Sequence, residues 1–261
     1  MRDTRDMLLV LLSSLLMLTG CSRRDILDDY PVSGVEISLD WNGVTNKLPE
    51  GVRVIFYPKN AEGRKIDTYL SVKGGKVKVP PGRYSVVVYN YDTETVQIRG
   101  EEAYETIEAF TGHCNGLGIA GTEQLVWGPD PLYVVRIDDL KIENSEEELQ
   151  LNWKPKLVVK TYSFKLKVQG LEYVSSIVGS IEGMSSCYDL GLGCGKAGDS
   201  PIYFAARGSA GEVTGSFTVF GTSEGVISRA GNAIKLTLAF VKTDNKVQKM
   251  EVDITEVIAN S

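Results

Sequence analysis

The sequence predicts an all-β protein in which two tandem β-sandwich domains follow an N-terminal export signal. Three observations support this fold class. Short segments in which apolar and polar residues alternate recur along the chain, with turn residues about every ten positions, as in half-buried strands. No stretch has the spacing of a long amphipathic helix. The chain has 261 residues, which leaves room beyond the signal for two domains of about 100 to 150 residues each.

The first twenty residues have the pattern of an export signal. Residues 7–18, MLLVLLSSLLML, carry no charge, and their length suits a signal-peptide core but is too short to cross a bilayer. Leu18-Thr19-Gly20-Cys21 follows and resembles the lipobox of bacterial lipoproteins, in which cleavage leaves an acylated cysteine as the first residue. The resemblance implies that residues 1–20 are a cleaved lipoprotein signal peptide and that Cys21 carries the lipid, where more than one acyl chain anchors a protein stably. The alternative is an ordinary secretory signal with an incidental cysteine.

Residues 21–31 are predicted to be a lipidated tether, because they are mostly polar or charged. The N-terminal sandwich is predicted over residues 32–155. Val35, Ile37 and Leu39 alternate with polar residues and begin its first strand. Turns at Asn42-Gly43, Gly74-Gly75 and Pro80-Pro81-Gly82 separate the strands that follow. The strands expected in this half are 35–41, 52–57, 66–72, 76–79 and 84–91.

Residues 92–135 are less regular. Strand patterns occur at 96–98 and 132–137, a strand or a short helix fits 103–110, and residues 112–128 read as a Gly-rich loop. Pro155 marks the predicted boundary between the two domains.

The C-terminal sandwich is predicted over residues 156–261. Residues 173–181 fit a strand or a short helix, and residues 183–200 read as a Gly-rich loop. The strands expected in this half are 157–168, 202–206, 213–220, 233–241 and 247–257.

The charge distribution argues against a nucleic-acid partner. The chain has 28 basic and 34 acidic residues, which give a net charge of −6, and it contains no basic block. No apolar run beyond the leader approaches the length of a transmembrane helix. We therefore expect membrane contact through the lipid alone.

The cysteines permit one local disulfide. With Cys21 assigned to the lipid, Cys114, Cys187 and Cys194 remain, an odd number for an exported protein. Cys187 and Cys194 are close together in a Gly-rich segment, and both the bonded and the free state stay open.

The sequence shows no pattern that assigns a catalytic residue. His113 is the one histidine and lies next to Cys114, but catalytic pairs of this kind meet through the fold and not through sequence adjacency. Residues 221–225 match G-x-S-x-G, yet no histidine follows and the next residues lead into another strand. A hairpin turn is the better interpretation. The carboxylate pair of a glycoside hydrolase cannot be recognised from sequence, so a hydrolase remains a distant alternative.

No cofactor or metal site is predicted either. Residues 116–121 match G-x-G-x-x-G, but Trp127 to Pro131 leave no room for the helix that must follow. Residues 190–197 resemble a phosphate loop only superficially, because Ala197 stands where a hydroxyl is required. The acidic pairs and runs lack the glycine spacing of a calcium loop.

Aromatic residues support one alternative function. Exposed rings near the irregular loops of the first domain could stack on sugars, although strand alternation predicts that about half of these rings face the core. The alternative is therefore a surface glycan-binding lipoprotein. The aromatic residues in question are Tyr84, Tyr89, Tyr91, Tyr104, Trp127 and Tyr133.

Strand and turn patterns stand out in five segments, 84–100, 104–111, 162–184, 215–221 and 250–258. These segments resemble the fimbrillin-like lipoproteins of Bacteroidales, in particular uncharacterised two-domain members related to type V pilins. The resemblance implies transthyretin-like folds for both sandwiches, an outer-membrane location at the cell surface, and a non-enzymatic role in adhesion or pilus assembly. It also implies other fimbrial subunits, or surface glycans or proteins of a host or bacterium, as partners.

Pilin relatives assemble by strand addition, in which a protease removes the first strand after an arginine and another subunit fills the groove. Here Met250, Val252 and Ile254 alternate in a terminal segment that is either such a donor or the last strand of its own domain. We favour the last strand. Arg53 and Arg64 are the only arginines between the first and third strands, and neither lies in an obvious cleavage consensus. An accessory adhesin is therefore as compatible with the sequence as a polymerising subunit.

Overall fold

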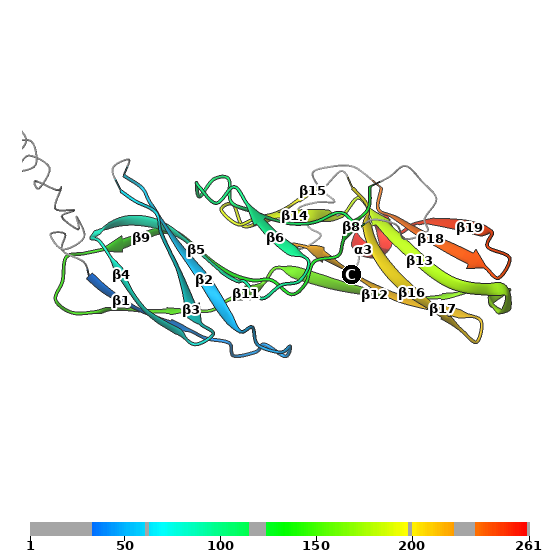
Figure 1. The fold of residues 1–261 in the computed structure, drawn as a ribbon, viewed down its shortest axis with the longest axis horizontal. Helices are drawn as coiled ribbons and strands as arrows, with labels where there is room; N and C mark the ends of the chain where they lie inside the picture. Colours follow the sequence, from blue (N-terminus) through cyan, green and yellow to red (C-terminus); the bar gives the residue numbers. More distant parts are fainter. Residues whose placement is uncertain (1–32, 61–62, 115–123, 198–199, 222–232, 260–261) are drawn as a thin grey trace, which may run out of the picture.

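The protein is an elongated all-β molecule (Figure 1). The computed structural model describes residues 33–60, 63–114, 124–197, 200–221 and 233–259. The strands of these residues form three sheets, and their helices are limited to the 3₁₀ turn η1 (Leu171–Tyr173) and the short helix α3 (Thr255–Ala259). The predicted all-β fold class is confirmed.

The first sheet occupies the left half of Figure 1 and has the order β10-β1-β4-β3-β2-β5-β9-β11. All neighbours are antiparallel except β1 and β10, which run parallel with Val35 opposite Leu149. Its strands are β1 (Ser33–Leu39), β2 (Gly51–Pro58), β3 (Ile66–Ser71), β4 (Gly74–Val79), β5 (Gly82–Asn90), β9 (Tyr133–Ile142), β10 (Leu149–Trp153) and β11 (Lys156–Leu157).

The alternation in the sequence fixes which side of the first sheet is buried. Val35, Ile37 and Leu39 face one core together with Val54 and Phe56 of β2, as the period-2 pattern predicts. Because β2 is central, its other face is buried as well, through Ile55 and Tyr57.

The second sheet lies in the right half of Figure 1, in the order β12-β17-β16-β13-β18-β19, and the short strand β8 pairs with β16. The segment 173–181, for which a strand and a short helix were the alternatives, is strand β13 from Val174 onward, while Tyr173 ends the turn η1. The predicted strand over 247–257 ends at Asp253, and α3 follows it. The strands are β8 (Val126–Trp127), β12 (Val159–Lys167), β13 (Val174–Glu182), β16 (Ile202–Ser209), β17 (Glu212–Phe220), β18 (Lys235–Lys242) and β19 (Val247–Asp253).

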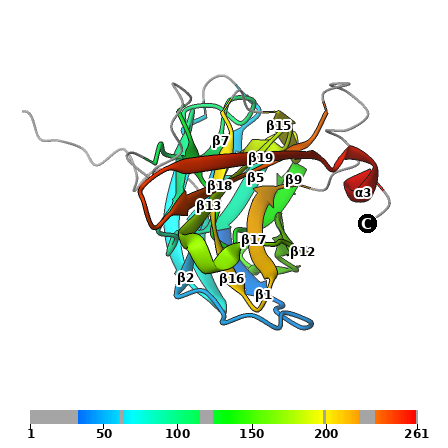
Figure 2. The same ribbon diagram turned by 90° about the vertical axis from the view of Figure 1, so that its right-hand side faces the viewer.

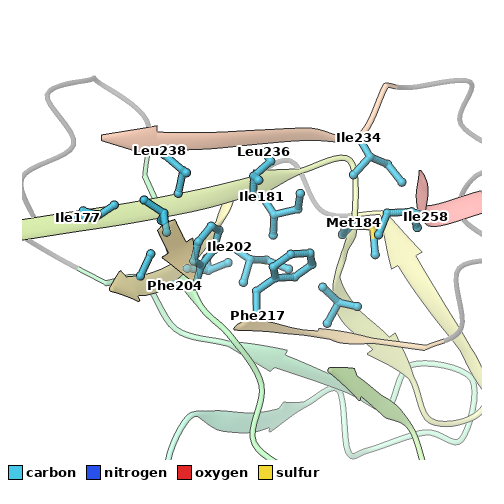
Figure 3. Close-up of a cluster of buried hydrophobic side chains, with 14 of the residues drawn as sticks. Ile177, Ile181, Met184, Ile202, Phe204, Phe217, Ile234, Leu236, Leu238 and Ile258 are labelled. Atoms are coloured by element: carbon cyan, nitrogen blue, oxygen red, sulfur yellow. The ribbon is translucent and has the colours of Figure 1, made fainter. Parts of the chain in front are cut away.

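The second sheet curves around its own core. In Figure 3, Leu236 and Leu238 on β18 point toward Phe217 on β17, with Ile181 and Ile202 between them. The end-on view in Figure 2 shows β19 crossing the top of the sheet while β12 lies at its right-hand side.

The third sheet has the order β15-β14-β7-β6 and combines strands from both halves of the chain. Ala109 on β7 lies opposite Tyr188 on β14, so this ladder pairs a strand that precedes residue 155 with a strand that follows it. The domain boundary at residue 155 stays a prediction. The predicted loop over 183–200 was wrong in part, because it contains two of these strands. The strands are β6 (Val96–Arg99), β7 (Glu108–Thr111), β14 (Ser185–Asp189) and β15 (Cys194–Ala197).

A shared core joins the third sheet to both other sheets. Ile55, Tyr57 and Val87 on the first sheet pack with buried residues of the third sheet, and Val159 and Phe220 of the second sheet complete the cluster. The two ends of the molecule are therefore connected by a buried apolar layer as well as by the chain.

Candidate functional site

The predicted lipidation site, Cys21, lies outside the described residues. The described chain begins at Ser33 with β1, in the half of the molecule opposite to β18 and β19 (Figure 1). Among the described residues, no helix is long and apolar enough to span a membrane.

The terminal segment is the last strand of its own sheet, as we favoured. β19 pairs with β18 from Lys235 opposite Asp253 to Val241 opposite Val247. Met250 and Ile254 pack against the core of the second sheet, and Ile258 of α3 is buried in it. Apolar contacts and backbone hydrogen bonds therefore hold this segment in place.

The outer strands of the second sheet, β12 and β19, are candidate docking edges. β12 pairs with β17 over its whole length, from Val159 opposite Phe220 to Lys167 opposite Glu212. Within the described ranges, neither β12 nor β19 pairs with a strand on its other side. Such an edge presents backbone N–H and C=O groups that another chain can bind.

The apolar face of these edges is incompletely covered. Tyr162, Phe164 and Leu166 on β12 point toward the core but are only half-buried, whereas Phe204 and Phe217 on the inner strands are buried. A hollow of about 570 Å³ lies at the end of the second sheet, where Val168, Leu171 and Met250 contribute to its lining. An added strand could bury more of this apolar surface.

Arg53 is not an accessible cleavage site. It lies within β2, its side chain is 17% exposed, and it forms ion pairs with Asp67 at 2.6 Å and with Glu101. Its Nη1 donates a 2.8 Å hydrogen bond to Tyr89 Oη, and the bond with Asp67, partly offset by burial, raises the pKa of the guanidinium. Arg64 is exposed, in the segment between β2 and β3.

The described cysteines are free thiols. Cys187 on β14 lies opposite Lys196, and Cys194 on β15 lies opposite Asp189, so the two cysteines are diagonal neighbours on one face. Burial, together with nearby Glu108, raises the pKa of the Cys187 thiol. The disulfide between Cys187 and Cys194 stays one of the two alternatives that the sequence leaves open.

The sequence motifs that superficially resemble catalytic or phosphate-binding patterns have structural roles wherever they fall within the described residues. His113 forms an isolated β-bridge with Val126, and burial raises the pKa of the neighbouring Cys114 thiol. Residues 190–197 form a turn and β15, not the strand-to-helix junction of a phosphate loop. Residues 116–121 and 222–225 lie outside the described ranges. The described part of the chain contains no group of three or more His, Cys, Asp or Glu side chains suited to a metal ion.

The aromatic residues divide between core and surface. Tyr84, Tyr89 and Tyr133 are buried, Tyr104 is half-buried, and Tyr91 and Trp127 are exposed. We did not single out Tyr69, which is 60% exposed on β3. Successive residues of a strand point to opposite faces. Because Leu70 is half-buried, the alternation in the sequence could have indicated that its neighbour Tyr69 faces solvent.

A comparison with models of known protein families shows which family this chain belongs to. Residues 20–205 match the family described as "Domain of unknown function (DUF5119)". The chain belongs to the DUF5119 family. The match includes Cys21 and extends across residue 155.

Relatives of this DUF5119 protein connect it to fimbriae. A Bacteroides ovatus protein named "Putative fimbrium anchoring subunit Fim4B" is 63% identical over 99% of this chain and 81% of its own length. A crystal structure of a "putative adhesin" from the same species is 61% identical, covers 93% of this chain and 89% of its own, and has a TM-score of 0.84. The fimbrial anchor protein Mfa2 of Porphyromonas gingivalis shares the fold at 11% identity, with a TM-score of 0.53 over 88% of this chain and 84% of its own.

These similarities confirm the predicted relationship to fimbrial proteins of Bacteroidales. The chain is a protein of fimbrial adhesion or assembly at the cell surface.

Proposed function

We propose that this chain is a non-enzymatic anchoring subunit, held in the outer membrane by acyl chains on Cys21 and joined to other fimbrial subunits by strand addition. The observation that carries the proposal is the 63% identity, over 99% of this chain, to a protein named as a fimbrium anchoring subunit. An anchor needs one attachment to the membrane and one to a partner, and the chain offers a candidate for each.

The membrane attachment is the lipobox cysteine. More than one acyl chain on Cys21 anchors a protein stably, at about 0.8 kcal/mol per buried methylene. Because β1 and the pair β18–β19 lie in opposite halves of the molecule (Figure 1), a lipid attached before β1 would leave the second sheet away from the membrane.

Fractionation of cells, combined with proteolysis of intact cells, tests this attachment. We expect the wild-type protein and a Cys194→Ala control in the membrane fraction and sensitive to added protease. Cys21→Ala should appear in the soluble fraction, because it lacks the acylated residue. If Cys21→Ala stays membrane-bound, the lipid anchor is excluded.

The partner attachment is an edge of the second sheet. A strand that adds to β12 would gain backbone hydrogen bonds and cover the half-buried Phe164 and Leu166. Lysines on both edge strands, such as Lys165 and Lys167 on β12 and Lys249 on β19, oppose unspecific edge pairing, so a specific partner is needed.

Strand addition is tested with a matched pair of variants on β12. Leu166→Asp places a charge on the half-buried face, whereas Ser163→Asp places it on an exposed position of the same strand. We expect the wild type and Ser163→Asp to give higher complexes on incompletely denaturing gels of cell envelopes, and Leu166→Asp to lose them. A wild-type protein that is monomeric under all conditions would exclude strand addition.

A further inference from the structure

The face of the first sheet that packs against the third sheet through Ile55 and Tyr57 also carries a row of aromatic and charged side chains on three neighbouring strands. Arg53 on β2 lies opposite Tyr69 on β3 and opposite Tyr89 on β5. Its guanidinium carbon is 5.5 Å from the ring centroid of Tyr69 and 5.9 Å from that of Tyr89, within cation–π range. Tyr89 is buried, whereas Tyr69 is 60% exposed, so the row presents one ring to solvent.

Arg53 is fixed in place beneath this exposed ring. Asp67 accepts hydrogen bonds from Nε at 2.9 Å and from Nη2 at 2.6 Å, a bidentate arrangement. Glu101, from the turn between β6 and β7, accepts hydrogen bonds from Arg53 and from Tyr89 Oη. The third sheet therefore helps to hold the base on which Tyr69 rests.

A second exposed ring lies beside the first. Tyr91 directly follows β5, is 45% exposed, and has its ring centroid 5.3 Å from that of Tyr69, at an interplanar angle of 79°. The ring lies over Gly51 of β2, where an added Cβ would be 2.7 Å from Tyr91 Oη and 3.0 Å from its Cε1. The absence of a side chain at Gly51 thus lets Tyr91 cross β2 and reach Tyr69.

The charges around the two rings indicate the kind of ligand. Asp67 and Glu101 are both ion-paired with Arg53, and each is 27% exposed, so their oxygens can accept hydrogen bonds while much of their charge is compensated. One guanidinium compensates only one of the two carboxylates, so these three side chains keep a net charge of −1, which disfavours anionic ligands. Two rigid exposed rings next to hydrogen-bond acceptors suit a ligand with apolar C–H faces and hydroxyl groups.

We propose that Tyr69 and Tyr91 form the centre of a binding site for a neutral glycan. The sugar would stack on the two rings and donate hydroxyl hydrogen bonds to Asp67 and Glu101. The site goes beyond the proposed anchoring and is independent of it, because it lies on the first sheet and β12 and β19 belong to the second.

Affinity electrophoresis of the purified full-length protein tests the site. The gels contain one neutral polysaccharide each, namely yeast mannan, galactomannan, xyloglucan or laminarin, with heparin as the anionic comparison. We expect retardation by at least one neutral polysaccharide and none by heparin. Tyr69→Ala and Tyr91→Ala should each weaken binding about tenfold, the typical loss of one stacked ring.

Two further variants separate stacking from other effects. Tyr91→Phe keeps the ring and should keep binding, and Tyr173→Ala removes a ring that is 63% exposed on the second half and should bind like the wild type. All four substitutions are at exposed rings, so their melting temperatures should match the wild type. The proposal is overturned if no neutral polysaccharide retards the protein, if only heparin does, or if the Tyr69→Ala, Tyr91→Ala double variant binds like the wild type.

Discussion

Ala109 on β7 and Tyr188 on β14 are direct partners in one antiparallel ladder, although they lie on opposite sides of residue 155. Both are buried in the core that joins the third sheet to the other two sheets. This pairing makes the stability of each half depend on residues of the other half. An elongated protein with such a connection resists bending between its ends better than two domains on a flexible linker would.

We therefore expect Leu190→Ala to destabilise the whole protein. Leu190 is 0% exposed in the shared core, and the loss of its side chain should cost about 2 to 5 kcal/mol. Calorimetry should show a single transition that moves to lower temperature. Leu192→Ala, at a neighbouring side chain that is 63% exposed, should leave the transition within about 0.5 kcal/mol of the wild type. Two separate transitions, only one of which responds to Leu190→Ala, would contradict the shared core.

The sequence predicted the alternating strands but could not predict the third sheet. β2 and β5 can be recognised in the sequence because each is a short run of apolar residues that is buried in the folded protein. β14 and β15 were read as a loop because glycine has a low β propensity, and residues 191, 193 and 195 are all glycine. β14 pairs with β7 and β15 pairs with β14, and the contact between β14 and β7 joins distant segments and leaves no periodic pattern in either one.

Of the candidate sites, the sequence predicted the terminal strand but not the pair of exposed tyrosines. The terminal strand was assigned correctly because Met250, Val252 and Ile254 alternate. Tyr91 is among the aromatic residues that the sequence singles out, but its contact with Tyr69 was missed because the two residues are separated in the sequence and meet only across β2. Gly51, which makes the contact sterically possible, is indistinguishable in sequence from a turn glycine.

Substitution of Gly100 should destabilise the third sheet through a specific clash. Gly100 has a φ of +67°, and an added Cβ would lie 2.0 Å from the carbonyl oxygen of Thr106. Gly43 offers a matched control, because its φ of +92° carries a similar backbone cost while nothing lies within 4 Å of its added Cβ. In urea unfolding, Gly43→Ala should cost about 1 to 2 kcal/mol, and Gly100→Ala clearly more. Equal losses would show that the turn between β6 and β7 can move away from the clash.

Glu108 should make stability depend on acidic pH. Burial acts to raise its pKa, but hydrogen bonds from Lys196 and Arg99 outweigh burial and leave the pKa below the ordinary value of 4.5. The unfolded chain then binds a proton more readily than the folded protein. The stabilisation from Glu108 is therefore fully present above pH 4.5 and is lost as the pH falls through its lowered pKa.

This dependence can be isolated with Glu108→Gln, which does not titrate. We expect the free energy of unfolding of the wild type to fall more steeply below about pH 4.5 than that of the variant. Urea titrations at successive pH values measure both slopes. Parallel curves for the two proteins would mean that Glu108 has the same pKa in the folded and unfolded states.

Arg53→Lys should weaken the link between the first sheet and the β6–β7 turn. A lysine keeps the charge but cannot reproduce the guanidinium contacts with Asp67, Glu101 and Tyr89. Because the Arg53 side chain is only 17% exposed, the lost hydrogen bonds should cost about 1 to 3 kcal/mol in urea unfolding. Arg83→Lys is the control, since Arg83 pairs with Asp139 at a site where its side chain is 63% exposed, and solvent screening makes that pair weak. If both variants unfold at the wild-type urea concentration, Arg53 contributes only as a surface charge, and the rigid base that we assign to Tyr69 does not exist.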